Sequence, residues 1–205
     1  MSKTKKRILN TARIIFNEQG YRNVTIRMIA EKLDMSSGNL NYHFKKREDI
    51  LEHLYFEMVT VFDKRVNDLS ETTFSIQQIY TDIFTSMERM VEYRFFWTDM
   101  YHLLQENGSI QTHFNDVYNK RKAGFIFLCR ELIKTGQMLT PSFNGQYEEL
   151  AETMINYGNT WIYASLLYNE ELTKDKINAS AKAMLQMLYP YLEDKIKAEA
   201  IKFTR

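Results

Sequence analysis

Residues 25–50 read TIRMIAEKLDMSSGNLNYHFKKREDI, and this stretch decides the fold that we predict for the chain. Apolar residues recur at helical spacing between positions 26 and 33, and Thr25 precedes them as a typical helix N-cap. A turn at residues 34–35 follows, and Ser36 stands as the N-cap of a second helix. Two short helices joined by a tight turn indicate a helix-turn-helix, whose second helix presents side chains to the base edges of DNA.

The segments on either side complete a three-helix head. Residues 4–18 carry apolar side chains at helical spacing, and Gly20 follows as a helix terminator. Residues 45–49 begin a fourth helix with two carboxylates in its first turn, where they suit the positive end of the helix dipole. Its apolar stripe continues to about Leu69, so this helix is expected to connect the head to the rest of the chain.

Five further helical segments are expected downstream, at residues 75–93, 95–105, 109–135, 147–168 and 174–202. Pro190 should kink or interrupt the last of them. Only 2 Pro and 7 Gly occur in 205 residues, which favours long helices over a many-stranded sheet. We therefore predict an all-α protein of about nine helices. It would have a helix-turn-helix head at residues 1–47 and a helical body for effector binding and dimerisation at residues 48–205.

The charge of the chain is unevenly distributed, although the net charge is only +1. Residues 1–50 hold 11 basic and 5 acidic residues, a charge of +6, whereas the remainder carries −5. A basic head on an acidic body suits a protein whose head alone contacts phosphates. A solvated basic surface without any partner would show the same pattern, so charge alone does not decide between them.

The second helix of the pair exposes short polar groups that can lie close to a duplex. Gly38 allows a close approach, and Asn39 and Asn41 can both donate and accept, as adenine readout requires. We expect Phe44 in the core and Tyr42 outside it; the alternative is an ordinary helical hairpin with both aromatic residues in its core. The side chains expected to contact DNA are Thr25, Arg27, Ser36, Ser37, Gly38, Asn39, Asn41, Tyr42, His43, Lys46 and Arg47.

This head resembles the DNA-binding domain of the TetR-like (tetracycline repressor-like) family. The resemblance rests on FNEQGY at residues 16–21, TIRMIA at 25–30, SGNLNYHF at 37–44 and REDI at 47–50. It fixes three helices and the start of a fourth, while the body resembles the family only in length and helix count. The resemblance implies a ligand-responsive repressor that binds a pseudo-palindromic operator as a homodimer.

The sequence departs from the family pattern at two positions of the head. Asp34 stands where a glycine is common in the turn, and aspartate tolerates the left-handed backbone better than most residues. Asn41 stands where an aromatic residue is frequent, so no base preference can be carried over. The roles that the resemblance does imply are a recognition helix at residues 36–43, a cap beside a phosphate for Thr25, a base or backbone contact for Arg27, phosphate contacts for Tyr42 and His43, and the basic position of the fourth helix for Arg47.

The predicted body is rich in aromatic and methionine side chains, which allow two interpretations. Stripes of this kind at helical spacing usually form a packed core, whereas a partly hollow interior would bind a small apolar or amphipathic effector. The family resemblance favours the hollow interior. The side chains expected to line it are Trp97, Met100, Tyr101, Leu104, Phe125, Cys129, Met154, Tyr157 and Trp161.

The last two long helices offer apolar and small side chains for dimerisation. Two such pairs, related by a two-fold axis, would form a four-helix interface. The residues assigned to this interface are Leu150, Trp161, Ala164, Ser165 and Tyr168 on one helix, and Ile177, Ala181, Met184, Leu185 and Leu188 on the other.

Other functions have weaker support in the sequence. Asp99, His102, Glu106 and His113 could be drawn as a metal site, but such residues at helical spacing are usually solvated or hydrogen-bonded, so we expect no metal. We expect no cofactor and no catalysis, because the sequence shows no Ser-His-Asp grouping, Gly-rich phosphate loop or HExxH motif. A helical cofactor-binding enzyme and a structural helical interaction protein are the alternatives.

Cysteine content and hydropathy indicate the compartment. The single Cys129 excludes an internal disulfide, and its apolar neighbours predict a buried, inert thiol. The polar, basic start of the chain lacks the apolar region of a secretory signal, and no window approaches the ~18 apolar residues that a membrane span needs. We therefore expect a soluble, cytoplasmic protein without membrane contact.

Overall fold

The computed structural model describes residues 1–68 and 75–204, with side chains described for residues 1–60 and 75–202. The chain forms two compact units. The first comprises Met1–Lys64 and Glu92–His113, and the second comprises Arg65–Val91 and Phe114–Arg205. The domain boundary predicted after residue 47 separates a DNA-binding domain from an effector-binding domain. The two compact units are divided by contacts and not by function, so this boundary stays a prediction.

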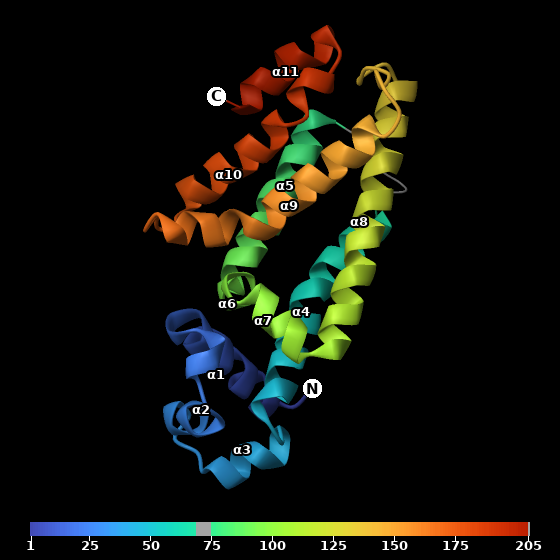
Figure 1. Ribbon diagram of the computed structural model, residues 1–205. Coiled ribbons are helices and arrows are strands. Elements are labelled where there is room, and N and C mark those ends of the chain that lie inside the picture. Colours follow the sequence, from blue (N-terminus) through green and yellow to red (C-terminus); the bar gives the residue numbers. More distant parts are fainter. Residues whose placement is uncertain (69–74, 205) are drawn as a thin grey trace. The chain divides into compact units, whose positions relative to one another are not determined.

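The first unit contains the predicted three-helix head and the helices packed against it (Figure 1). The apolar stripe of the first helix is buried as expected, and Phe16 is fully enclosed. Gly20 ends this helix at a φ of 79°, a left-handed value that strains residues with a Cβ, and its N–H donates to the Phe16 carbonyl. The elements of this unit are α1 (Lys3–Gln19), the 3-10 turn η1 (Tyr21–Asn23), α2 (Ile26–Lys32), α3 (Ser37–His43), most of α4 (Arg47–Asp68), α6 (Arg94–Thr98), α7 (Met100–Glu106) and the start of α8 (Gly108–Lys134).

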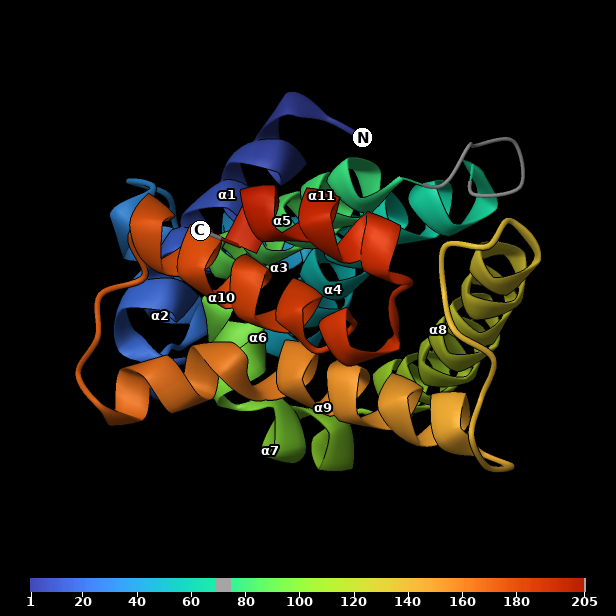
Figure 2. The ribbon, with the colours of Figure 1, turned by 90° about the horizontal axis from the view of Figure 1, so that it is seen from above.

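The second unit is a helical layer around its own apolar core. Its elements are the end of α4, α5 (Ile76–Glu92) up to Val91, the greater part of α8, α9 (Gln146–Leu167), α10 (Lys174–Gln186), the 3-10 turn η3 (Tyr189–Tyr191) and α11 (Asp194–Thr204). Figure 2 shows α10 between α9 and α11, which both contact it. The core cluster includes Cys129 and Met154, and half-buried apolar side chains such as Tyr80 and Phe125 pack against it.

The all-α prediction is confirmed, and two predicted segments are each divided. The segment expected at residues 95–105 forms α6 and α7, which meet at Asp99 with a φ of −109° and a ψ of 11°. The segment expected at 174–202 is interrupted at Pro190, as predicted, and forms α10, η3 and α11. The described residues therefore form eleven α-helices rather than about nine. The predicted end of the fourth helix at about Leu69 lies outside the described residues.

The structure corrects seven of the ten residues assigned to the dimer interface. Leu150, Trp161, Ser165, Ile177, Ala181, Leu185 and Leu188 are buried within the chain itself, so they have little surface left to lose on association. Ala164 is exposed and Met184 is half-buried, so these two assignments stay predictions. Apolar residues on the same helix are usually divided between the core of the subunit and its surface, and the sequence pattern alone does not make this division. Tyr168, which was assigned to the interface, is 80% exposed. Tyr163, Leu166 and Leu167, which were not assigned, are also exposed on the last turns of α9.

Among residues 1–68 and 75–204, no helix combines the length and the apolar character that a membrane span requires.

Candidate nucleic-acid interface

Helix α2 is the scaffold helix of the candidate interface. The Thr25 side chain caps it by accepting a hydrogen bond from the Met28 N–H at 3.3 Å, as its residue type predicts. Ile29 and Ala30 are buried against the rest of the head. Arg27 lies on the opposite, exposed face, where its Nε is 2.8 Å from the Glu31 carboxylate. The helix is therefore held by its inner face while Thr25 and Arg27 remain accessible.

A tight turn joins α2 to α3, the candidate recognition helix. Asp34 occupies it with a φ of 53°, in the left-handed region that aspartate tolerates better than most residues. The Met35 N–H donates back to the Ala30 carbonyl at 3.1 Å and closes the turn. Ser36 then caps α3 by accepting from the Asn39 N–H at 3.1 Å. Local hydrogen bonds thus fix where α3 begins.

One face of α3 is buried and the other is presented to solvent. Leu40 is fully buried, and Phe44 at the end of the helix is 2% exposed, which confirms its place in the core. Tyr42 is 86% exposed, an unusual position for an aromatic side chain. Its ring meets the half-buried His43 ring at a centroid distance of 5.3 Å. The other exposed residues of this helix and its cap are Ser36, Gly38, Asn39 and Asn41, with Ser37 half-buried.

The exposed face of α3 is uncharged or basic throughout. Residues 35–47 contain no aspartate or glutamate, and Lys45 and Lys46 follow the helix as exposed side chains. At Gly38 an added Cβ would lie 3.9 Å from the Ser36 hydroxyl and near nothing else within 4 Å, so the helix surface is flat there. A flat helical surface of hydrogen-bonding groups bordered by cations fits the major groove of DNA, where base edges lie between two rows of phosphates.

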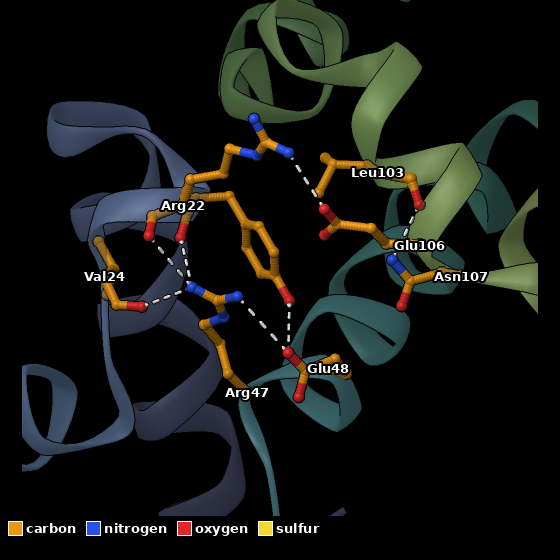
Figure 3. Close-up of polar contacts among 8 residues, drawn as sticks. Arg22, Val24, Arg47, Glu48, Leu103, Glu106 and Asn107 are labelled. Carbon is orange, nitrogen blue, oxygen red and sulfur yellow. Dashed lines mark hydrogen bonds and ion pairs between the residues drawn. The ribbon is translucent and has the colours of Figure 1, made fainter.

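The side chain of Arg47, the first residue of α4, is directed toward the segment between α1 and α2. Its Nη1 donates to the carbonyls of Tyr21 and Val24 at 3.1 and 2.9 Å, and to that of Arg22 at 3.4 Å. The guanidinium also covers the Tyr21 ring at 4.1 Å from its centroid. It lies 3.5 Å from the Glu48 carboxylate (Figure 3). Arg47 therefore ties the first residue of α4 to the segment between α1 and α2. Its predicted phosphate contact stays a prediction.

The polar contacts around Arg47 continue toward α7 through exposed ionic groups. Tyr21 is buried beneath Arg47, and burial raises the pKa of its phenol to about 12, although the Arg47 charge acts in the opposite direction. Arg22, next to it, forms an ion pair with Glu106 of α7 at 3.1 Å, and Asn107 closes the end of α7 on the Leu103 carbonyl (Figure 3). The sequence offers no signal for this network, because the cation of Arg47 is separated from its three acceptors by more than twenty positions.

A second junction connects α1 to the start of α6. The Asn17 side chain donates to the Glu92 carbonyl at 2.8 Å and accepts from the Phe95 N–H at 3.1 Å. Beside it, the Phe16 and Phe95 rings lie 5.2 Å apart, and Arg13 is 3.6 Å from the Glu92 carboxylate. The head is therefore joined to α6 by both apolar and polar contacts.

The residues predicted to line an effector cavity are divided between the two compact units. Trp97, Met100, Tyr101 and Leu104 belong to the first unit, where Trp97 is buried and Tyr101 is 70% exposed. Phe125, Cys129, Met154, Tyr157 and Trp161 belong to the second unit, on α8 and α9. Cys129 is buried there as predicted, and burial raises the pKa of its thiol to about 12. The assignment of these residues to an effector site stays a prediction.

The side chains considered as metal ligands have other partners or stay apart. Glu106 pairs with Arg22, and the His113 Nδ1 lies 3.0 Å from the Tyr55 hydroxyl. In the part of the chain that the structure describes, no three histidine, cysteine or carboxylate side chains form a group that could hold a metal ion.

The chain matches two models of protein families. The TetR model, described as bacterial transcriptional repressor, matches residues 57–200, and the model of bacterial regulatory proteins of the tetR family matches residues 8–54. The second match contains the helix pair described above, and the first spans more than half of the chain. The matches place the protein among helix-turn-helix transcriptional regulators. Within that class, the chain belongs to the TetR family.

Individual proteins are similar to this chain over different lengths. The "Probable HTH-type transcriptional regulator YttP" of Bacillus subtilis is 31% identical over 61 residues, which are 30% of each protein. The chain thus spans about a third of the length of this curated relative. A solved TetR-family regulator from Marinobacter aquaeolei VT8 has a TM-score of 0.89 and 20% identity, over 99% of this chain and 98% of its own. A regulator from Saccharomonospora viridis, solved in complex with choline, has a TM-score of 0.68 and 22% identity, over 94% and 100% of the two chains.

Proposed function

We propose that this protein is a ligand-responsive transcriptional repressor that binds a pseudo-palindromic operator as a homodimer. The observation that carries the proposal is the surface of α3, which is capped, anchored by Leu40 and Phe44, and free of acidic residues. Asn39 and Asn41 would read base edges, while Thr25, Tyr42 and Lys46 would contact phosphates on either side. A cytoplasmic location and the lack of a catalytic activity are part of the same proposal.

The test is to sequence the fragments that the protein retains from its own genomic DNA and to measure their affinity by fluorescence anisotropy. A dimer with about 6–8 phosphate contacts should lose roughly 10³-fold in affinity between 50 and 200 mM salt. A signal that does not depend on salt, or no retained fragment, would refute the DNA-binding proposal.

Point variants separate base readout from phosphate binding. Asn39→Ala or Asn41→Ala should change which fragments are preferred, because each removes a donor and an acceptor from the base-reading face. Lys46→Ala should instead weaken all fragments about equally. Asn119→Ala, at an exposed position of α8, is the matched control and should leave both properties unchanged.

For the effector, we propose a small apolar or amphipathic molecule bound within the helical body. The second unit supports this with a layer of half-buried apolar side chains, Phe125 among them, around its core cluster. The regulator from Saccharomonospora viridis was solved with choline, a small organic molecule. Isothermal titration of a panel of such molecules would test the idea, and binding should weaken in Phe125→Ala.

For the dimer, we propose an interface centred on the exposed end of α9. Tyr163 and Leu167 are one helical turn apart, and Tyr168 follows at 80% exposure. A group of exposed apolar side chains of this kind marks an association surface. Light scattering should give twice the chain mass of 24.5 kDa at micromolar concentration. Leu167→Glu should shift this mass toward the monomer, whereas Phe143→Glu, at an exposed loop position, should not.

A further inference from the structure

The chain contains two Asn-Gly pairs, at residues 107–108 and 144–145. Asparagine is chemically labile, because the backbone nitrogen of the next residue can attack its side-chain carbonyl. A following glycine leaves that nitrogen accessible, since it has no Cβ. The attack requires the side chain and the peptide unit between the two residues to rotate. The surroundings of each pair therefore determine whether it reacts in the folded protein.

Asn144 and Gly145 lie at the end of the exposed loop that precedes α9. Residues 139–144 are all exposed, and a Cβ added at Gly145 would meet no atom within 4 Å. Within the described part of the chain, the Asn144 side chain has no hydrogen-bond partner. Neither the Asn144 carbonyl nor the Gly145 N–H takes part in a hydrogen bond among the same residues. Both reacting groups, and the peptide unit that joins them, are therefore not held by hydrogen bonds.

The start of α9 favours a glycine at position 145. Its φ of 88° lies in the left-handed region, which strains residues with a Cβ, and its carbonyl accepts the Glu149 N–H at 3.0 Å. The backbone of the turn around it is closed by a long hydrogen bond, from the Gln146 N–H to the Phe143 carbonyl at 3.4 Å. The way in which α9 begins thus places an unhindered nitrogen directly after an exposed asparagine.

The other pair, Asn107 and Gly108, is held by hydrogen bonds on both sides of the reacting carbon. The Asn107 Nδ2 donates to the Leu103 carbonyl at 2.8 Å. The Asn107 main-chain carbonyl accepts the Gln111 N–H at 2.9 Å, where α8 begins. Attack by the Gly108 nitrogen requires these bonds to break, which should slow the reaction by roughly tenfold or more.

We propose that Asn144 is a site of spontaneous deamidation in the folded protein and that the fold protects Asn107 from the same reaction. The Gly145 nitrogen forms a bond to the Asn144 Cγ, and the side-chain amide nitrogen leaves as ammonia with the proton of the Gly145 N–H. Water then opens the resulting cyclic imide at either of its two carbonyls. Opening at one carbonyl gives aspartate. Opening at the other gives isoaspartate, in which the main chain passes through the side-chain carbon.

The modification places a negative charge directly before α9. The first turn of this helix already holds Glu148 and Glu149, and carboxylates are favoured near the positive end of a helix dipole. The formal net charge of the chain, which is +1, falls to zero when Asn144 is converted. The modified protein should therefore stay folded and separate from the unmodified protein by ion exchange.

The test is to keep the folded protein in mildly alkaline buffer and to follow both pairs by mass spectrometry after digestion with trypsin. Lys120 and Lys134 lie between the pairs, so Asn107 and Asn144 fall on different peptides of the same sample and Asn107 is the internal control. We expect the Asn144 peptide to be converted at least roughly tenfold faster than the Asn107 peptide. In concentrated urea the difference in surroundings is lost, and the two rates should converge.

The products identify the chemical route. The peptide of Asn144→Asp marks the aspartate product, and the imide route also gives an isoaspartate peptide that elutes separately. In water enriched in heavy oxygen, both products should carry the label. Asn144→Gln, whose longer side chain disfavours the ring closure, should stay unconverted under the same conditions. Aspartate as the sole product would show direct hydrolysis of the amide and overturn the imide route.

Comparison of the folded and unfolded samples gives the outcomes that would overturn the proposal. Equal rates at Asn107 and Asn144 in the folded protein would mean that the fold protects neither residue. Conversion of Asn144 in urea but not in the folded protein would mean that the loop before α9 is protected. No conversion in either sample would contradict the lability of both pairs.

Discussion

At the scale of single residues, Arg47 shows how one side chain can connect three parts of the head. Its guanidinium reaches three carbonyls of the segment between α1 and α2 and covers the Tyr21 ring, while its own backbone begins α4. A planar fork with several donors can satisfy such a group of acceptors, whereas a lysine ammonium cannot do so in the same geometry. For holding these carbonyls, the planar shape of the Arg47 guanidinium is therefore more important than its charge.

We predict that Arg47→Lys destabilises the protein by about 1–2 kcal/mol although the net charge is unchanged, because carbonyls that Arg47 serves lose their donor. Urea denaturation gives the free energy of unfolding. Lys46→Ala is the comparison, since Lys46 is exposed and should cost less than about 0.5 kcal/mol. Equal stability of Arg47→Lys and wild type would show that the hydrogen bonds to the carbonyls contribute little.

Cys129 leads to a prediction about alkaline pH. Burial first, and then the nearby Glu148 charge, raise the pKa of its thiol from 9.0 to about 12. The folded state therefore favours the protonated thiol, so this contribution to stability is complete below pH 9 and is lost as the pH rises toward 12. Between pH 8 and pH 10 the wild type should lose up to about 1.4 kcal/mol more than Cys129→Ala. Identical pH profiles for the two proteins would contradict the prediction.

At the scale of elements, the sequence predicts those helix ends and interruptions that depend only on neighbouring residues. Thr25 and Ser36 cap their helices because a hydroxyl two or three residues before a free N–H can accept from it, and this geometry is local. Pro190 interrupts a helix for an equally local reason, the absence of an N–H. The division between α6 and α7 at Asp99 has no such signal, since neither glycine nor proline stands there.

The same distinction between features set by neighbouring residues and features set by distant ones applies to the candidate site. The exposed face of α3 could be predicted, because the spacing of Leu40 and Phe44 determines which side of the helix is buried. The inward position of Arg47 could not, because its acceptors come from a distant segment and a basic residue at a helix start usually faces solvent. Which apolar side chains of α9 stay at the surface depends likewise on how α10 packs against it.

The junction between α1 and α6 can be tested at Asn17. We predict that Asn17→Ala lowers the free energy of unfolding by about 1–2 kcal/mol, because the Glu92 carbonyl and the Phe95 N–H both lose their partner. Hydrogen exchange at the Phe95 amide should accelerate in the same variant. Asn17→Asp keeps an acceptor for this amide and should preserve its protection. Unchanged exchange in Asn17→Ala would mean that the aromatic contact alone holds the junction.

At the scale of the whole molecule, dimerisation and DNA binding should be linked. A dimer presents two heads to two half-sites, so it releases about twice as many counterions as a monomer does. We predict that Leu167→Glu, which should separate the subunits, halves the slope of log affinity against log salt and weakens binding to a full operator. Anisotropy measurements over a salt series would show this, with Phe143→Glu as the control. A monomeric variant with the wild-type slope would separate the two properties.

Each of the two compact units carries one tryptophan, so each can be followed separately by fluorescence. The chain has two tryptophans, Trp97 in the first unit and Trp161 in the second, and both indoles are buried, with 3% exposure. Each unit thus contains its own fluorophore, which is shielded from water. Its emission should shift to the red when that unit unfolds and water reaches the indole. Replacing one indole at a time by phenylalanine would make the emission of the protein report on a single unit. Coincident urea transitions in Trp97→Phe and Trp161→Phe would mean that the chain melts as one cooperative system, and separated transitions would rank the stability of the two units directly.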